Sequence, residues 1–265
     1  MNRIPSFITN GTLTFTVTTN GYKFLTWNLW LHCQRLQVPW KLCILCLDKE
    51  SYRFFQTVAN IPCIFLEGNG LRVEGNPMKV SQHGTGDFNR ITRLKLKAFT
   101  DILQKEGIQK LLYLDGDIVL FRDPWPYLQT LLSADKPLWF QCDEHNAEYN
   151  CSGHEGLCHN CCTGVIAFYL QDASIRERLA SVFSIEDALW KECKANNDQE
   201  YVQKQIAKQG MLFMTFSRAL FPNGQFLHED KWKSLKEPYL LHFNFLVGTA
   251  KERVIRSKGF WLVPY

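Results

Sequence analysis

The chain has no apolar run long enough to cross a bilayer. None of its segments reaches the roughly 18 consecutive apolar residues that a membrane-spanning helix needs. The first residues, from Met1 to Phe15, also lack the continuous apolar core of a signal peptide. We therefore expect a complete, soluble, cytoplasmic protein. The alternative is a lumenal domain from which a membrane anchor has been removed.

The charges show no strong excess of one sign. Lys and Arg total 30 and Asp and Glu total 26, so the formal net charge is only +4. This balance gives no general reason to expect nucleic acid as a partner. The chain also lacks internal repeats, low-complexity tracts and linkers. We therefore expect a single domain over residues 1–265.

Hydrophobic residues make up 46% of the chain and aromatic residues 14%, which suits one well-buried globular α/β domain. In the first half, short apolar runs alternate with helical patterns, which predicts a mostly parallel central sheet flanked by helices on both faces. The expected strands are 13–19, 42–47, 63–66 and 111–114, and the expected helices are 22–36, 51–59 and 90–105. In the second half we expect strands at 139–141, 165–169, 212–216 and 239–245, and helices at 173–183, 184–194, 197–208 and 249–258.

Cysteine is crowded in one short stretch. Four of the ten cysteines lie at Cys151, Cys158, Cys161 and Cys162, with His154 and His159 close by. The spacing of Cys158 and Cys161 is one that zinc sites use, so a structural zinc or a disulfide is one hypothesis. Reduced, partly buried thiols are the other.

The pair Asp115 and Asp117 ends the most central of the predicted strands, with Gly116 between them. Side chains two residues apart on an extended chain point to the same side. Two carboxylates about 4 Å apart repel by about 4 kcal/mol at an effective dielectric near 20, so they need a cation or good solvation. Oxygen ligands suit Mg²⁺ or Mn²⁺, which also bind a diphosphate. A solvated turn after a strand is the alternative for this motif alone.

Ordered motifs along most of the chain resemble the nucleotide-diphospho-sugar transferases of GT-A fold, and among them the rhamnogalacturonan xylosyltransferase-like group with its microbial and viral relatives. The matching blocks begin at Lys97 and continue through 111–117, 122–124, 162–164, 197–199, 242–244, 248–251 and 259–261. The resemblance implies a GT-A fold, with a nucleotide-binding half (1–120) and an acceptor- and sugar-binding half (121–265). It also implies a UDP- or GDP-sugar donor, a divalent cation (Mn²⁺ or Mg²⁺) and a hydroxyl acceptor such as a glycan or glycoprotein. Because many glycosyltransferases have a membrane anchor, it makes the Golgi lumen the alternative location.

The resemblance also implies roles for individual residues. It makes Asp115 and Asp117 the metal and donor pair, with His242 as the third metal ligand, although a lone histidine on an apolar strand is more often a core residue. Gly248 and Lys251 correspond to groups that hold the diphosphate. Their spacing from His242 is longer than in other retaining transferases and is like that of the xylosyltransferase-like group.

Further candidates lie near the ends of the first two strands and in the helix before the acidic pair. The expected donor-binding residues there are Thr18, Thr19, Asn20, Tyr22, Asp48 and Lys97, together with Gly116. Asp48 has the alternative role of capping the next helix, and Lys95 and Arg93 compete with Lys97.

Thr163, Gly164, Gln199 and Asn244 are expected at the sugar and acceptor end. Asp198 has two candidate roles there: an N-cap, or an active-site group. If the reaction inverts the anomeric configuration, a carboxylate must deprotonate the acceptor. Asp198 is the first candidate for that base, and Asp143 and Glu144 follow. If the reaction retains the configuration, the leaving phosphate can take the proton.

Two other functions fit part of the sequence. A haloacid-dehalogenase-like phosphatase also carries D-x-D after a strand, and Val119 fits its motif. That family needs a late acidic pair around a glycine, which we do not find after residue 200. The second alternative is a zinc-stabilised, non-enzymatic binding domain built on the cysteine cluster.

Overall fold

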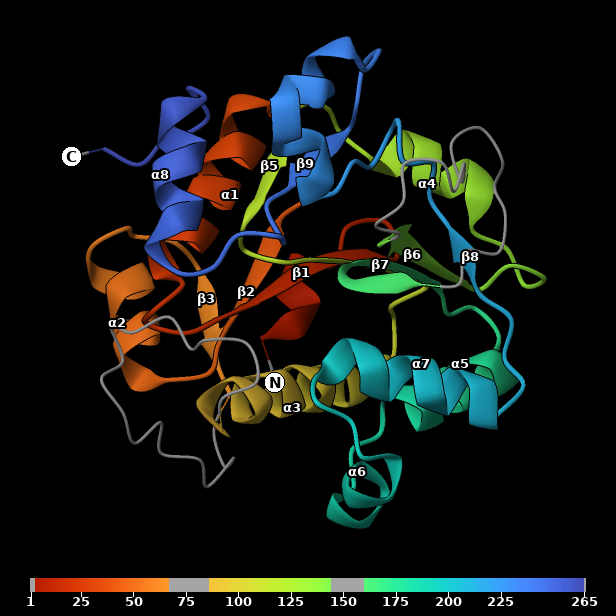
Figure 1. The fold of residues 1–265 in the computed structure, drawn as a ribbon. Helices are drawn as coiled ribbons and strands as arrows, with labels where there is room; N and C mark the ends of the chain where they lie inside the picture. The colour runs from red at the N-terminus through yellow and green to blue at the C-terminus, as the bar shows by residue number, and fades with distance from the viewer. Residues whose placement is uncertain (1–2, 67–85, 144–159, 265) are drawn as a thin grey trace.

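A seven-stranded sheet forms the centre of the protein (Figure 1). The computed structural model describes residues 3–66, 86–143 and 160–264. In spatial order the strands are β3 (Cys63–Phe65), β2 (Leu42–Cys46), β1 (Thr12–Thr18), β4 (Lys110–Leu114), β7 (Cys161–Tyr169), β6 (Leu138–Cys142) and β8 (Met214–Thr215). The predicted α/β architecture is confirmed, and β4 is the central strand, as expected.

The sheet is mostly parallel, with one reversed strand. The β3–β2, β2–β1 and β1–β4 pairs are parallel, as the alternating strands and helices of the first half predict. Strand β7 runs antiparallel to both of its neighbours, β4 and β6. Because β7 is reversed, its first residues lie at the same edge of the sheet as the last residues of β4 and β6.

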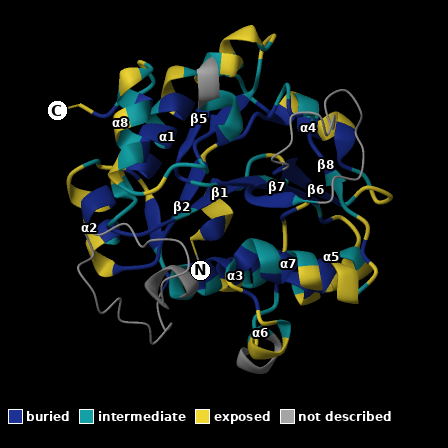
Figure 2. Cartoon of the chain, viewed as in Figure 1, coloured by how far each residue is buried: buried dark blue, intermediate teal, exposed yellow. Residues whose placement is uncertain are grey.

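Helices cover both faces of this sheet. The described helices are α1 (Lys23–Arg35), α2 (Lys49–Thr57), α3 (Gly86–Leu103), α4 (Trp125–Leu131), α5 (Ala173–Phe183), α6 (Asp187–Cys193), α7 (Asp198–Lys208) and α8 (Thr249–Ser257). One face packs against α3, α5 and α7, and the other packs against α1, α2 and α4. Figure 2 shows the strands buried between layers whose outer surfaces are exposed. Within the described segments, no helix combines the length and the apolar character that a membrane span requires.

Strand β4 illustrates why the sheet lies at the centre. Leu111 and Tyr113 pack into the core under α3, whereas Leu112 and Leu114 pack into the core under α1. Both faces of the strand are therefore apolar, as the continuous run of hydrophobic residues predicts. The strand delivers Asp115 to the carboxyl edge of the sheet as soon as it ends.

A second, two-stranded sheet is not predicted from the sequence. It pairs β5 (Ile118–Leu120) with β9 (Leu240–His242) in antiparallel register, with Ile118 opposite His242. Leu25 of α1 and Ile255 of α8 pack against it. This small sheet joins the chain just after the acidic pair to a strand near the C-terminus. Helix α4 and the 3₁₀ segments Ile4–Phe7 and Gly224–Ser234 are also absent from the prediction.

Candidate active site

A cavity of about 380 Å³ opens at the carboxyl edge of the main sheet. Its walls come from the ends of β1, β2 and β4, the start of β7, and residues of α3, α7, β9 and α8. This is the edge at which open α/β sheets bind ligands. Most of the residues predicted from the sequence line this cavity.

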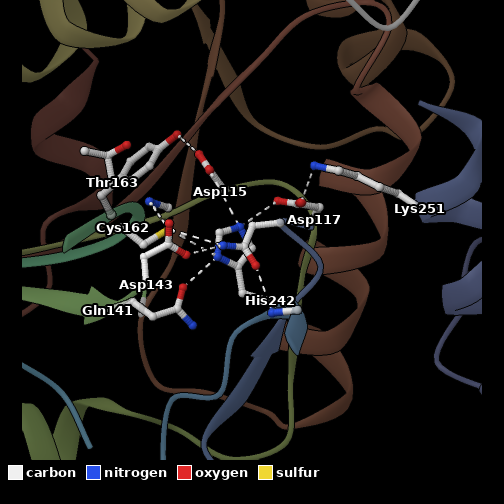
Figure 3. Close-up of polar contacts among 12 residues, drawn as sticks. Asp115, Asp117, Gln141, Asp143, Cys162, Thr163, His242 and Lys251 are labelled. Carbon is white, nitrogen blue, oxygen red and sulfur yellow. Dashed lines mark hydrogen bonds and ion pairs between the residues drawn. The ribbon is translucent and has the colours of Figure 1, made fainter. Parts of the chain in front are cut away.

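Asp115, Asp117 and His242 meet on one wall of the cavity. The Nε2 atom of His242 lies 3.3 Å from Oδ1 of Asp117 and 3.8 Å from Oδ2 of Asp115. Each of the three residues offers one possible ligand atom, and these three atoms lie within 4.8 Å of one another. The β5–β9 ladder explains this proximity, because Asp117 directly precedes β5 and His242 ends β9. Figure 3 shows the imidazole close to both carboxylates, with Gln141 on its other side.

In each of the two carboxylates, one oxygen is already held by the protein. Oδ2 of Asp117 accepts a hydrogen bond from Lys251 Nζ at 2.5 Å. Oδ1 of Asp115 accepts from the Tyr113 hydroxyl at 2.5 Å and from Lys95 Nζ at 3.2 Å. The other oxygen of each group faces His242. The three side chains therefore offer one atom each, which suits a six-coordinate ion with positions left for a substrate.

Gln141 holds the imidazole of His242, and Pro222 holds its backbone. The Nδ1 atom of His242 lies 2.6 Å from Oε1 of Gln141, and the His242 backbone N–H donates to the Pro222 carbonyl at 3.1 Å. His242 is 1% exposed, so its ring has little freedom to turn.

Gly164 allows His242 and Asp115 to approach each other. A Cβ atom at this position would lie 2.1 Å from Cε1 of His242 and 2.9 Å from Oδ2 of Asp115. The Gly164 carbonyl also accepts the backbone N–H of Asp115 at 2.8 Å. The pairing of β6 with β7 changes register here, because Phe140 pairs with Ile166 but the next residue, Gln141, pairs with Cys162. This bulge lies where Thr163 and Gly164 enter the cavity wall.

Two buried lysines neutralise part of the negative charge. Burial alone would lower the pKa of Lys251, but Asp117 outweighs it and raises this pKa above its usual value. Burial also acts to lower the pKa of Lys95, but Asp115 and Asp198 outweigh it and raise this pKa above its usual value. For Asp117, burial works to raise the pKa, while Lys251 and, when its ring is protonated, His242 lower it well below its usual range. Asp117, Lys95 and Lys251 are therefore all charged at neutral pH.

Lys95, rather than Lys97, reaches the cavity. Lys95 lies between Asp115 at 3.2 Å and Asp198 at 3.0 Å. Lys97 lies outside the cavity lining, with 47% of its side chain exposed, and pairs with Asp101 at 3.5 Å. The helical period gives the reason, because Lys95 falls on the apolar side of α3 and Lys97 does not. A charged residue within an apolar stripe was the signal that could have identified it.

The sugar end predicted for the cavity contains two differently held carboxylates. Asp198 binds Lys95 and accepts from the Thr163 hydroxyl at 2.8 Å. It therefore has a cationic partner. The capping role falls to Asn197, whose side chain accepts from the Glu200 N–H, so the N-cap hypothesis for Asp198 is wrong.

Asp143 has amide partners and, among the described residues, no ion pair. Its Oδ2 accepts from Gln199 Nε2 at 3.0 Å, and its Oδ1 accepts from Asn244 Nδ2 at 2.8 Å. All three side chains line the cavity. Glu144, the other predicted base, lies outside the described residues.

The donor residues predicted at the strand ends divide into two groups. Thr18, Thr19 and Tyr22 line the cavity, and the Lys251 ammonium lies 5.5 Å from the centre of the Tyr22 ring. Asn20 and Asp48 are buried but do not line it.

Asp48 accepts the N–H groups of Ser51 and Asn20, so it is the N-cap of α2, which was its alternative role. Gly248 is the N-cap of α8 and also lies outside the lining. Its φ of 63° lies in the left-handed region that favours glycine. Gly116 lines the cavity, and a Cβ there would lie 2.4 Å from the Thr26 hydroxyl.

The cysteine cluster is only partly described. Cys161 and Cys162 are buried at the start of β7, and the Cys162 sulfur accepts from the Gly164 N–H at 3.4 Å. Burial raises the pKa of the Cys162 thiol well above its usual value, and the charge of Asp143 adds to this effect. Cys151, Cys158, His154 and His159 lie outside the described residues. Tyr113, Gln141 and Cys162 are neighbours of the acidic pair and His242 that were not predicted from the sequence.

Comparison with known proteins identifies a matching family. The sequence pattern of the family described as nucleotide-diphospho-sugar transferase matches residues 40–254. A search of curated protein sequences found no significant match.

Several solved glycosyltransferases share the fold. The galactosyltransferase LgtC, solved with donor and acceptor sugar analogs, has a TM-score of 0.56 at 14% identity, covering 95% of this chain and 97% of LgtC. GlyE from Streptococcus pneumoniae has a TM-score of 0.55 at 14% identity, covering 97% of this chain. This chain spans 61% of the length of GlyE. A glycosyltransferase involved in glycosylation of the major capsid of PBCV-1 has a TM-score of 0.54 at 10% identity, covering 93% of this chain and 98% of that one. These similarities establish the GT-A fold.

Proposed function

Because the chain belongs to the nucleotide-diphospho-sugar transferase family, we propose that it transfers a sugar from a UDP- or GDP-sugar to a hydroxyl group, with Mn²⁺ or Mg²⁺ bound by Asp115, Asp117 and His242. The observation that carries this proposal is the convergence of these three side chains on one wall of a cavity. The acceptor hydroxyl belongs to a glycan or glycoprotein. The division into a nucleotide-binding half (1–120) and an acceptor half (121–265) is part of the same proposal.

The side chains in the cavity fit a divalent cation. Among the described lining residues there are four carboxylates (Asp115, Asp117, Asp143, Asp198) and two ammonium groups (Lys95, Lys251). A buried excess of negative charge is costly, and a divalent ion offsets it. Two carboxylate oxygens and one imidazole nitrogen are a suitable ligand set for Mn²⁺ or Mg²⁺.

The remaining residues have complementary tasks. A bound divalent ion supplies Lewis acidity that neutralises charge on the leaving diphosphate. Lys251, beside Asp117, adds an ammonium group near the same phosphates. Thr18, Thr19 and Tyr22 line the part of the cavity that we assign to the base and ribose. Lys95 holds Asp115 and Asp198 together, so it joins the metal end of the cavity to the sugar end.

The two carboxylates at the sugar end differ in their suitability for proton transfer. Asp198 is paired with an ammonium group, and a carboxylate oxygen occupied in this way is less available to accept a proton. Asp143 is held by Gln199 and Asn244, whose amides orient it without neutralising it. We therefore assign Asp143, together with Gln199, Asn244, Thr163 and Gly164, to the sugar and acceptor hydroxyls. If a protein base takes the acceptor proton, Asp143 is the better candidate.

The other two hypotheses have less support. Membership of the transferase family argues against the phosphatase. A cavity lined by buried carboxylates and lysines argues against a purely structural zinc domain.

Isothermal calorimetry with UDP-glucose, UDP-galactose, UDP-xylose and GDP-mannose tests the proposal directly. We expect at least one donor to bind in the presence of Mn²⁺ and to lose measurable binding when a chelator is added. Release of the nucleotide diphosphate, with water as a substitute acceptor, should follow the same metal dependence. Donor affinity that is unchanged by the chelator would contradict the proposed role of the metal.

The neighbouring lysines of α3 provide a matched pair of variants. We expect Lys95→Met to lower donor turnover by at least ~10²-fold, because the sugar and metal ends would no longer be held together and small misplacements are that costly. Lys97→Met should stay close to wild type in turnover and within about 0.5 kcal/mol in stability, as is usual for exposed positions. Steady-state nucleotide release and thermal unfolding measure both effects. Equal losses in the two variants would contradict the assignment of Lys95.

A further inference from the structure

The amide of Gln141 can adopt only one orientation. Gln141 is fully buried on β6, and its Nε2 atom lies 3.0 Å from the carbonyl oxygens of both Phe221 and Pro222. Carbonyl oxygens only accept hydrogen bonds, so the NH₂ group must face them. The opposite orientation would place an amide oxygen against two carbonyl oxygens and lose both bonds. Oε1 of Gln141 must therefore face His242.

This orientation determines which nitrogen of His242 carries the proton. Nδ1 of His242 lies 2.6 Å from Oε1 of Gln141, and an amide oxygen cannot donate. Nδ1 must therefore be the N–H donor. In the neutral ring, Nε2 then has a free lone pair, and it is this atom that faces Asp117 at 3.3 Å and Asp115 at 3.8 Å. The Cys162 sulfur, 3.7 Å from Nδ1, is a much weaker acceptor for the same proton.

We propose that Gln141 is a positioning residue that fixes His242 as the Nδ1–H tautomer and so presents the Nε2 lone pair to the divalent cation. The same loop holds His242 a second time, because the Pro222 carbonyl accepts both from Gln141 and from the His242 backbone. Gln141 thus holds a proton on Nδ1 and the loop holds the position of the residue, so Nε2 is the ring atom left for the cation. The part of this inference that concerns the cation depends on the proposed function, whereas the tautomer does not.

Nuclear magnetic resonance of the metal-free protein, labelled with ¹⁵N-histidine, tests the tautomer. Long-range ¹H–¹⁵N correlations in alkaline buffer report which ring nitrogen is protonated, and a His242→Asn variant identifies the signals. We expect Nδ1–H in the wild type and a shift toward Nε2–H in Gln141→Met. Gln141→Glu should retain Nδ1–H, because its carboxylate keeps an acceptor oxygen for Nδ1 although it loses the two bonds that the amide donates to Phe221 and Pro222. An Nε2–H signal in the wild type, or no change in Gln141→Met, would overturn the proposal.

Electron paramagnetic resonance titration with Mn²⁺ then tests the consequence for binding. Gln141→Met should weaken Mn²⁺ binding about 10- to 100-fold, the usual effect of losing a partner of a metal-bound histidine. Gln141→Glu should stay within a few fold of wild type. If neither variant folds, the tautomer of the wild type still decides the question, because Nε2–H there overturns the proposal.

Asn223→Ala is the matched control. Asn223 is 1% exposed, and its amide ties the same loop to β6 by donating to the Cys142 carbonyl at 3.2 Å. Wild-type affinity in this control supports the proposal, whereas a loss as large as that in Gln141→Met would reveal a merely structural role and overturn it. A wild type that binds no Mn²⁺ would refute the proposed function and the cation part of this inference, while the tautomer measurement would still decide the role of Gln141.

Discussion

Asp117→Ala is expected to abolish metal-dependent donor binding. Asp117 is 3% exposed, faces Nε2 of His242 with one oxygen and binds Lys251 with the other. Its removal takes away a proposed metal ligand and releases the lysine that stands beside it. A bound metal ion contributes several kcal/mol of charge stabilisation, and each step of about 1.4 kcal/mol corresponds to a tenfold change in rate. We therefore expect turnover to fall at least ~10³-fold. Mn²⁺ titration, donor calorimetry and nucleotide release measure the effect.

A double variant separates binding from stability. Asp117→Ala alone leaves the Lys251 ammonium buried without this partner, and breaking a buried ion pair costs about 3–5 kcal/mol. Adding Lys251→Met removes the unpaired charge, so much of the stability should return in thermal unfolding. Metal-dependent binding should not return. Recovery of donor affinity in the double variant would mean that Asp117 acts through folding alone.

Gly164→Ala is the second change with a large expected effect. The added methyl group would lie 2.1 Å from Cε1 and 2.8 Å from Nε2 of His242, and 2.9 Å from Oδ2 of Asp115. These atoms belong to the proposed metal ligands, and the imidazole is buried and held by Gln141, so it has little room to move aside. We expect Mn²⁺ affinity and turnover to fall at least ~10²-fold, the order of effect that a misplacement of about 1 Å produces. Mn²⁺ titration and nucleotide release measure it.

Gly210→Ala is the control for this substitution. Gly210 has a φ of +57°, and no atom of the described residues lies within 4 Å of the added Cβ. Alanine in that conformation should cost about 1 kcal/mol of stability. Its Mn²⁺ affinity should equal that of the wild type. If the two alanine variants lose metal affinity equally, the close contact at Gly164 is not the cause.

Much of the fold can be predicted from local patterns in the sequence. The strands β1, β2 and β4 appear as short runs of strand-forming residues between helical patterns, and parallel strands of this kind place their ends at one edge of a sheet. Asp115 and Asp117 could therefore be placed at that edge from the sequence alone. His242 could be linked to them only through the resemblance to a family, because no local pattern connects residues so far apart in the chain.

The features that escaped prediction depend on tertiary contacts. Strand β5 has only three residues, too few for a periodic pattern, and it exists because β9 returns to pair with it. The choice between Lys95 and Lys97 has a similar origin. Both lysines look alike in the sequence, and the orientation of α3 against the sheet decides which one meets Asp115. The role of Gln141 depends on two carbonyl groups from a distant loop, which leave no trace near position 141.

The short β5–β9 ladder has a consequence for how this protein can vary. The ladder pairs Leu120 with Leu240, so the two ends of the long segment between them lie side by side, close to the acidic pair. Lengthening a surface loop within such a closed segment carries only a small entropic penalty, which grows with the logarithm of loop length. A change in the length of a turn such as the one between α4 and β6 should therefore cost little stability and leave the geometry around His242 unchanged.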